Sequence, residues 1–259
     1  MILRNPKSRF KLNIKRKDRV LEIGGGHNPH PKAHVVVDKF VDENTHRGGD
    51  LKLLPGQTFI QANGENLPFK DNEFDYVICC HVLEHVDNPE RFIAEMTRVA
   101  KRGYVETPSL MGEYLAPKYS HRWTILEIDG KMVFKEKADL NIPEEKLNFG
   151  DIFLYFLNSQ SLAYKLFFRT YPNVFTVKLE WENELDFVVE PKEEKYQKYF
   201  TSPWTLEMIQ KQFPKKSIIR DFGELVSAFG SLLASYTKAL IKGKTHQGLK
   251  QIGLGEVQK

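Results

Sequence analysis

The pattern of apolar and polar positions divides the chain into two differently organised parts. Short apolar runs separated by loops occupy 19–23, 34–38, 58–62, 74–80 and 103–107. Several of these runs are apolar without alternation, which is typical of strands in a sheet covered on both faces. The pattern predicts an α/β fold with a mostly parallel sheet, helices on both faces and a mixed α/β elaboration after the fifth strand.

One helix is strongly marked between the fourth and fifth runs. Asn88 is suited to cap a helix, and Pro89 is suited to its first position. Phe92, Ile93 and Met96 then follow at helical spacing. The spacing predicts a helix that begins at Pro89 and buries one apolar face.

After Pro108 the pattern changes. Asp129–Gly130 lies between two apolar runs and predicts a hairpin, and residues 175–189 alternate as further antiparallel pieces. We expect a mostly buried helix over 151–169 and another over 202–213, capped by Ser202. The predicted divisions are a basic arm (1–18), a core (19–108), a substrate-side elaboration (109–200) and C-terminal helices with a tail (201–259).

Composition excludes several classes of protein. The 259 residues are 41% hydrophobic and 28% charged, close to the globular average. The longest apolar run, Ile152–Leu157, is far shorter than the roughly 20 residues that cross a bilayer. Cys79 and Cys80 are adjacent and would point to opposite faces of a strand, so we expect neither a disulfide nor a metal site. We expect no secretory signal and a cytoplasmic location.

Charge is concentrated at the N-terminus. Basic residues dominate residues 1–20, where Asp18 is the only acid. Such an arm can touch phosphates or anionic lipid head groups, but basic termini are more often solvated. We therefore favour a solvated arm, with contact to phosphates or anionic lipids as the alternative.

A glycine turn follows the first predicted strand. Glu22 stands near the end of that strand, and Gly24, Gly25 and Gly26 follow in the turn. Glycines there let the backbone approach a ligand closely. Asp38 ends the next strand, where a carboxylate can accept hydrogen bonds from ribose hydroxyls. Together these residues favour a nucleoside ligand over a simple tight turn.

These residues resemble the S-adenosylmethionine-dependent methyltransferases of the Rossmann-like class, and within them the type 11 methyltransferase-domain group. The resemblance covers about 19–108, because residues 63–86 are similar to the family's adenine-enclosing segment and fourth strand, and 103–109 to its fifth strand. It implies S-adenosylmethionine as cofactor. The donor-binding residues that follow from it are Glu22, Gly24, Gly25, Gly26, Asp38, Asn63, Gly64 and Cys80.

The chain departs from the family at three places. Asn28 stands where a third glycine is usual, and Asn63 stands where an aspartate is usual. Residues 27–33 contain two prolines and are too short for the usual helix after the first strand. A dinucleotide needs that helix N-terminus for its pyrophosphate, so the departure counts against an NAD enzyme.

The acceptor side of the predicted site lies at the ends of the fourth and fifth strands. We expect catalytic roles for His81, Glu106 and His121, with His81 as the first candidate for general base. His85 is also suited to organise the helix that follows it, and it is predicted, with Arg122 and Trp123, to bind substrate.

The resemblance implies methyl transfer, and we expect O-methylation of a sugar or another small hydroxylated acceptor. The alternatives are an RNA or protein methyltransferase and a non-catalytic S-adenosylmethionine-binding protein. The acidic run at 180–186 makes nucleic acid an unfavoured partner. The small apolar residues of 222–244 suggest packing against the domain or a homo-oligomer through the C-terminal helices.

Overall fold

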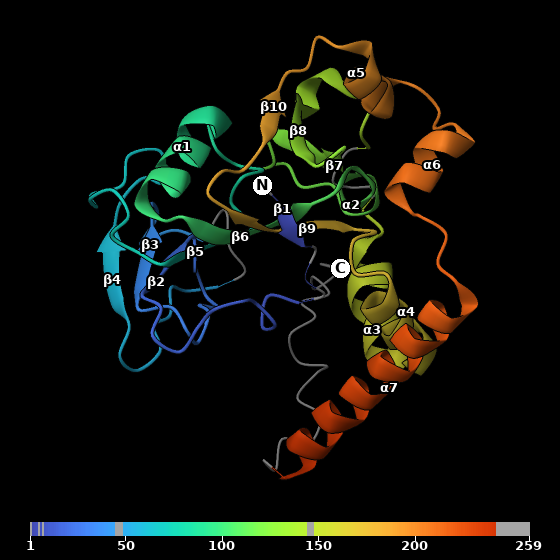
Figure 1. Cartoon of the computed structure of the whole chain (residues 1–259), viewed down its shortest axis with the longest axis horizontal. Coiled ribbons are helices and arrows are strands. Elements are labelled where there is room, and N and C mark those ends of the chain that lie inside the picture. The colour runs from blue at the N-terminus through green and yellow to red at the C-terminus, as the bar shows by residue number, and fades with distance from the viewer. Residues whose placement is uncertain (1, 5, 7, 45–48, 144–147, 242–259) are drawn as a thin grey trace, which may run out of the picture.

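The computed structural model describes residues 2–4, 6, 8–44, 49–143 and 148–241. Its main sheet has the order β1-β9-β6-β5-β2-β3-β4 (Figure 1). The strands are β1 (Ile2–Arg4), β2 (Val20–Ile23), β3 (Val35–Asp38), β4 (Thr58–Gln61), β5 (Tyr76–Cys80), β6 (Arg102–Pro108) and β9 (Thr176–Glu182). Strands β2 to β6 are parallel, and β9 is antiparallel to both β6 and β1. The mostly parallel sheet is therefore confirmed.

The strand order reverses beside β2, because β3 lies on one side of it and β5 on the other. In open parallel sheets this arrangement opens a crevice at the carboxyl ends of the strands. The fold thus places the glycine turn after β2 where a ligand can enter.

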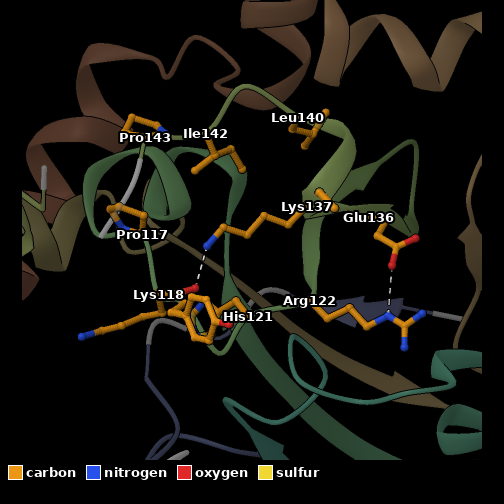
Figure 2. Close-up of a pocket in the computed structure, with 11 residues that line it drawn as sticks. Pro117, Lys118, His121, Arg122, Glu136, Lys137, Leu140, Ile142 and Pro143 are labelled. Carbon is orange, nitrogen blue, oxygen red and sulfur yellow. Dashed lines mark hydrogen bonds and ion pairs between the residues drawn. The ribbon is translucent and has the colours of Figure 1, made fainter. Parts of the chain in front are cut away.

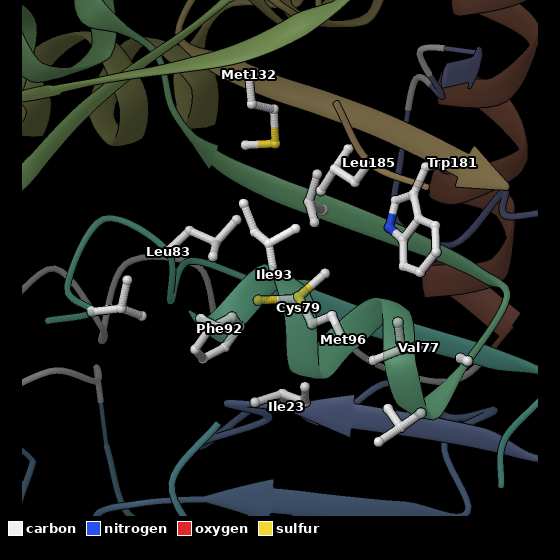
Figure 3. Close-up of a cluster of buried hydrophobic side chains, with 14 of the residues drawn as sticks. Ile23, Val77, Cys79, Leu83, Phe92, Ile93, Met96, Met132, Trp181 and Leu185 are labelled. Carbon is white, nitrogen blue, oxygen red and sulfur yellow. The ribbon is translucent and has the colours of Figure 1, made fainter. Parts of the chain in front are cut away.

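Helix α1 (Pro89–Val99) covers one face of the sheet, as predicted. The Asn88 side chain accepts a hydrogen bond from the backbone N–H of Arg91 at 2.9 Å, and Pro89 begins the helix. Phe92, Ile93 and Met96 pack with strand residues in the core drawn in Figure 3. Burial of this apolar face stabilises the helix, since isolated helices of this length are marginal in water.

The extended segment 8–18 covers the opposite face of β2, β5 and β6, a place where we expected helices. Leu12 and Ile14 pack there with Tyr76, Ile78 and Tyr104. Polar bonds hold the segment as well, since the Asn13 backbone N–H donates to Glu180 at 2.6 Å and Arg102 pairs with Asp18 at 2.8 Å. This part of the basic arm lies on the sheet.

A second, three-stranded sheet has the order β10-β8-β7 and lies above the main sheet in Figure 1. It contains β7 (Trp123–Ile128), β8 (Lys131–Glu136) and β10 (Phe187–Val189). The hairpin is confirmed, because Asp129 and Gly130 have φ angles of 50° and 80° between β7 and β8. The expectation for residues 187–189 is wrong, because β10 pairs parallel with β8. Strand β9, also from the expected elaboration, belongs to the main sheet.

Helices surround the second sheet. They are α2 (Leu110–Leu115), the 3-10 turn η1 (Lys137–Asp139), α5 (Glu194–Thr201) and α6 (Leu206–Gln212). Helix α6 begins later than predicted, because the Thr205 side chain accepts from the Met208 backbone N–H at 3.3 Å and acts as the cap. Ser202 instead ends α5. The predicted cap at Ser202 is therefore wrong, because α5 extends to Thr201 and leaves Ser202 at its C-terminal end.

The helix expected over 151–169 is broken, and none of its described side chains is buried, so the prediction of one mostly buried helix is wrong. It consists of the π-helical turn η3 (Asp151–Phe156), α3 (Leu157–Gln160) and α4 (Leu162–Thr170). Ser161 is extended between α3 and α4, and its side chain accepts from the Tyr164 backbone N–H at 3.2 Å. The Phe156 side chain is 52% exposed.

Helix α7 (Ile218–Ile241) packs along α4, and both lie apart from the main sheet in Figure 1. Phe222, Val226, Phe229 and Leu233 recur at helical spacing and are exposed. No helix among the described residues combines the length and apolarity needed to cross a membrane.

Glu22 ties the N-terminal arm to the loop that follows β2. Its carboxylate is buried, accepts from the His30 backbone N–H at 2.5 Å, and pairs with Arg9 at 2.9 Å. Burial raises the pKa of Glu22 to about 7, although both of these partners oppose the shift. The folded protein therefore holds a proton on Glu22 more tightly than the unfolded chain does.

We expect Glu22 to make the protein less stable as pH rises from about 4.5 to about 7. A group whose pKa is higher in the folded than in the unfolded state stabilises the protein fully below the unfolded pKa. This stabilisation disappears as the pH rises to the folded pKa, and for Glu22 it amounts to about 3 kcal/mol of unfolding free energy. Glu22→Gln should flatten this part of a plot of unfolding free energy against pH, measured by urea denaturation. Glu207→Gln, on an exposed side chain of α6, is the control. Identical slopes for Glu22→Gln and wild type would contradict the assignment.

Candidate functional site

A cavity of about 290 Å³ opens at the carboxyl ends of β2, β3 and β4. Gly24 and Gly26 form one wall, with φ angles of 72° and 51° that favour glycine. A Cβ on Gly24 would lie 2.1 Å from the Val82 side chain, and one on Gly64 would lie 2.2 Å from Phe92. At both positions a side chain would collide with its neighbour, so this close packing around the cavity requires glycine.

The predicted ribose and adenine residues line the same cavity. Asp38 stands at the end of β3, and Asn63 and Gly64 follow β4. The Asn63 side chain accepts from the Glu65 backbone N–H at 3.0 Å, which fixes the loop. The structure therefore brings Gly24, Gly26, Asp38, Asn63 and Gly64 together.

The charges around the cavity suit a cationic ligand. Its lining contains four carboxylates and one lysine, and these are Asp38, Glu43, Glu65, Asp87 and Lys39. Residues 27–34 form turns and irregular loop, so no helix N-terminus is present there for a pyrophosphate. S-adenosylmethionine carries a positive sulfonium and no phosphate, and therefore these residues fit it better than they fit a dinucleotide.

Three expected donor-binding residues lie elsewhere. Glu22 is occupied by Arg9 and the His30 backbone, and neither it nor Gly25 lines the cavity. Cys80 packs among Ile14 and Ile78 on the other face of β5, and burial raises the pKa of its thiol. Their contribution is to the shape of the turn and the strand below it.

His81 also lines this cavity and lies immediately after β5. Its φ angle of 55° is unusual for a residue with a side chain, and its backbone N–H donates to the Glu106 carbonyl at 2.7 Å. The ring lies 3.4 Å from Glu84 and 3.7 Å from Glu106. Burial alone would lower the pKa of His81, but the two carboxylates raise it to about 10. At neutral pH the ring is therefore an imidazolium.

Glu106 is the ionised partner of His81. Burial alone would raise its pKa, but His81 and the nearby Lys178 ammonium lower the pKa of Glu106 to about 2. Lys178 lies 3.8 Å away on β9, and the Tyr104 hydroxyl donates to the same carboxylate. The predicted pair His81 and Glu106 is thus in contact, and the antiparallel strand β9 completes it.

His121 and Arg122 line a second cavity, of about 670 Å³, shown in Figure 2. His121 hydrogen-bonds to Glu113, whose carboxylate also pairs with Lys137 at 3.0 Å. Lys137 in turn donates to the Lys118 carbonyl at 2.7 Å, and Arg122 donates to Glu136 at 3.2 Å. This cavity is bordered by basic side chains from the loop before β7 and the turn after β8.

Trp123 does not offer an aromatic face to a ligand, which corrects the prediction from sequence. The indole is buried in the core, and its N–H donates to the Val86 carbonyl at 2.8 Å. His85 does line the cavity beside the glycine turn, and its Nδ1 bonds to the Ser120 carbonyl at 2.8 Å. His85 therefore lies at the cavity, whereas Trp123 is a core residue whose indole is hydrogen-bonded to the loop that carries His85.

Sequence reasoning missed Glu84 and Phe92 as parts of the site. Glu84 is 1% exposed and contacts His81, while Phe92, from α1, lines the cavity beside the glycine turn. A carboxylate three residues after His81 was a usable signal, because an apolar run rarely buries an acid without a partner. For Phe92 the helical spacing indicated only core packing.

Comparison with known proteins is consistent with this geometry. A protein-family profile described as "Methyltransferase domain" matches residues 34–105. An uncharacterized protein of Methanocaldococcus jannaschii is 52% identical over 87 residues, covering 34% of this chain and 42% of that protein. A ubiquinone/menaquinone biosynthesis C-methyltransferase of Stenotrophomonas maltophilia is 31% identical over 141 residues, covering 46% and 54%. The chain thus spans about half the length of these relatives.

Among solved structures, an S-adenosylmethionine-dependent methyltransferase from Mesorhizobium loti is 18% identical to this chain, with a TM-score of 0.29. The match covers 46% of this chain and 57% of that one. The profile match spans β3 to β6, the same part of the chain that supplies Asp38, Asn63 and His81. Within residues 34–105 the chain is therefore similar to methyltransferase domains.

Proposed function

We propose that the chain transfers a methyl group from S-adenosylmethionine to an oxygen of a sugar or another small hydroxylated acceptor. One observation carries the proposal: the His81–Glu106 pair lies at the end of a cavity lined by the glycine turn, Asp38 and Asn63. The donor supplies an electrophilic sulfonium methyl group when it is bound. Alignment of donor and acceptor supplies much of the rate enhancement in such reactions, of the order of 7–11 kcal/mol.

The chain's own residues support an oxygen acceptor through their chemistry. Lys118, Arg122 and Lys137 border the second cavity and provide donors for hydroxyl or anionic oxygens. As an imidazolium at neutral pH, His81 donates a hydrogen bond that can orient an acceptor oxygen. It can take a proton from that oxygen only after it has lost its own. The relatives named above include a C-methyltransferase, so the support for oxygen comes from these side chains.

A cytoplasmic location belongs to the same proposal. Cys79 and Cys80 are both free and buried, which suits a reducing compartment. Detection of the native protein in the cytosolic fraction of its own cells tests this point, and its recovery in a secreted fraction would contradict it.

Asp38 provides the test of donor binding. Asp38→Ala should weaken the binding of S-adenosylmethionine by about 1–3 kcal/mol, because ribose hydroxyls would lose a charged acceptor. Calorimetry of the whole chain measures this affinity. Asp71→Ala, outside the cavity, is the control and should bind like wild type. Binding of NADH without binding of S-adenosylmethionine would overturn the assignment of the cofactor.

The role of His81 is tested by the pH dependence of turnover. Nucleotide sugars, short glycans, tRNA and protein acceptors are first screened by release of S-adenosylhomocysteine. If His81 must lose its proton to act as base, the rate should rise about tenfold per pH unit towards pH 10. His81→Gln should remove this rise and leave donor affinity unchanged. Turnover with tRNA or protein and with no glycan would remove the sugar proposal and leave methyl transfer standing.

We also propose that α7 mediates self-association. Its exposed side chains Phe222, Val226, Phe229 and Leu233 fall on one helical stripe, and exposed apolar surface of this kind marks interaction sites. A second copy of α7 would offer the same stripe in return, as two-fold symmetry requires.

Sedimentation equilibrium should show a dimer for the whole chain, and Phe222→Asp with Phe229→Asp should shift it towards monomer at micromolar concentration. Glu207→Gln serves again as the surface control. A wild-type chain that stays monomeric at high concentration would contradict self-association.

A further inference from the structure

Three potential metal ligands converge between the two cavities. Glu84 and His85 lie in the loop between β5 and α1, and His121 lies in the loop before β7. A carboxylate oxygen of Glu84 and one ring nitrogen of each histidine all lie within 4.8 Å of one another. His85 lines the donor cavity and His121 lines the second one. The three groups therefore stand where an acceptor would meet the donor.

The hydrogen bonds of both histidines fix the tautomer that a metal requires. Nδ1 of His85 bonds to the Ser120 carbonyl, which can only accept, so Nδ1 carries the proton and a neutral ring has its lone pair on Nε2. Nδ1 of His121 bonds to the Glu113 carboxylate in the same way. Metal-binding histidines are commonly oriented by a carbonyl or carboxylate on the other ring nitrogen. Both kinds of support are present here.

Glu84 is the carboxylate of this cluster, and it is 1% exposed. Its Oε2 accepts from the Thr107 hydroxyl at 3.0 Å. Among the described residues, its Oε1 makes no hydrogen bond and has one ion-pair contact, to Nδ1 of His81 at 3.4 Å. Because that contact is longer than a normal hydrogen bond, Oε1 has room for a shorter contact with a metal ion.

The two loops are held in fixed register. The backbone N–H groups of Arg122 and Trp123 both donate to the Glu84 carbonyl, at 2.7 and 3.0 Å, and the Trp123 indole N–H donates to Val86. With the bond from His85 to Ser120, these contacts bind the segment before β7 to the segment before α1. Preorganised ligands of this kind are what a metal site needs.

We propose that Glu84, His85 and His121 bind one divalent transition-metal ion, whose remaining position receives an oxygen of the methyl acceptor. Two imidazoles and a carboxylate suit Zn²⁺, Mn²⁺ or Fe²⁺ better than Mg²⁺ or Ca²⁺. Three protein ligands leave a coordination position open, and a metal there would polarise an acceptor oxygen. This assignment replaces the expectation of no metal site drawn from the cysteines. Its second half rests on the proposed function, whereas metal binding by itself does not.

Zn²⁺ binding to the whole chain, freed of metal by a chelator, tests the site directly. Calorimetry should show one equivalent bound with at least hundredfold preference over Mg²⁺, and Co²⁺ should give visible absorption typical of nitrogen and oxygen ligation. His85→Ala and His121→Ala should each abolish stoichiometric binding. His27 is exposed, follows the glycine turn and is not one of the three ligands. His27→Ala is therefore the matched control and should bind Zn²⁺ like wild type.

Glu113→Gln provides a variant that leaves all three ligands in place. It should weaken Zn²⁺ binding by about 10- to 100-fold, because the carboxylate no longer orients His121. Circular dichroism checks that each variant is folded. Absence of stoichiometric Zn²⁺ binding by wild type, or unchanged binding after both histidine substitutions, would overturn the site. Because this assay contains neither donor nor acceptor, its failure is distinguishable from failure of the methyltransferase proposal.

Discussion

The buried carboxylate of Glu84 is the constraint on which the region between the two cavities depends. Its backbone carbonyl receives two N–H groups from the start of β7, and its side chain receives the Thr107 hydroxyl from β6 and faces His81 from β5. A carboxylate that is 1% exposed must keep such partners, because an unpaired buried charge costs several kcal/mol. One residue thereby holds together two parallel strands and the loop that enters the second sheet.

An extended segment, in place of a helix, covers one face of the main sheet. The segment 8–18 packs Leu12 and Ile14 against one face, and α1 covers the other. Parallel strands need both faces covered, and an extended segment does this when its own polar backbone finds partners. The Asn13 backbone N–H donates to Glu180, and the Asn13 carbonyl accepts from the Arg102 side chain at 3.1 Å. The side-chain pair of Arg9 with Glu22 adds a further contact. The arm is therefore part of the fold that shapes the glycine turn.

Charge differs between the two ends of the site. Carboxylates such as Asp38 and Glu65 line the donor cavity, whereas Lys118, Arg122 and Lys137 border the second one. The two regions meet near His81, His85 and His121. The two cavities thus differ in the sign of the charge that prevails around them. This separation is produced by the loop before β7, which brings residues of the elaboration to the edge of the parallel sheet.

The sequence by itself determined those features that depend on local pattern. The five parallel strands, the α1 helix with its Asn88 cap and the turn at Asp129–Gly130 follow from short-range periodicity and backbone preference. Gly24 and Asp38 were found in the same way, because chain order places the ends of neighbouring parallel strands together.

Tertiary structure decided what depends on contacts between distant segments. The parallel pairing of β10, the burial of Trp123, and the exposure of Phe156 are set by which surface each segment meets. The same holds for the meeting of Glu84 with His121, 37 positions apart, and for the raised pKa of His81. Local sequence does not predict such neighbours, because burial and charge act through space. Only the folded chain brings these groups within a few ångströms of one another.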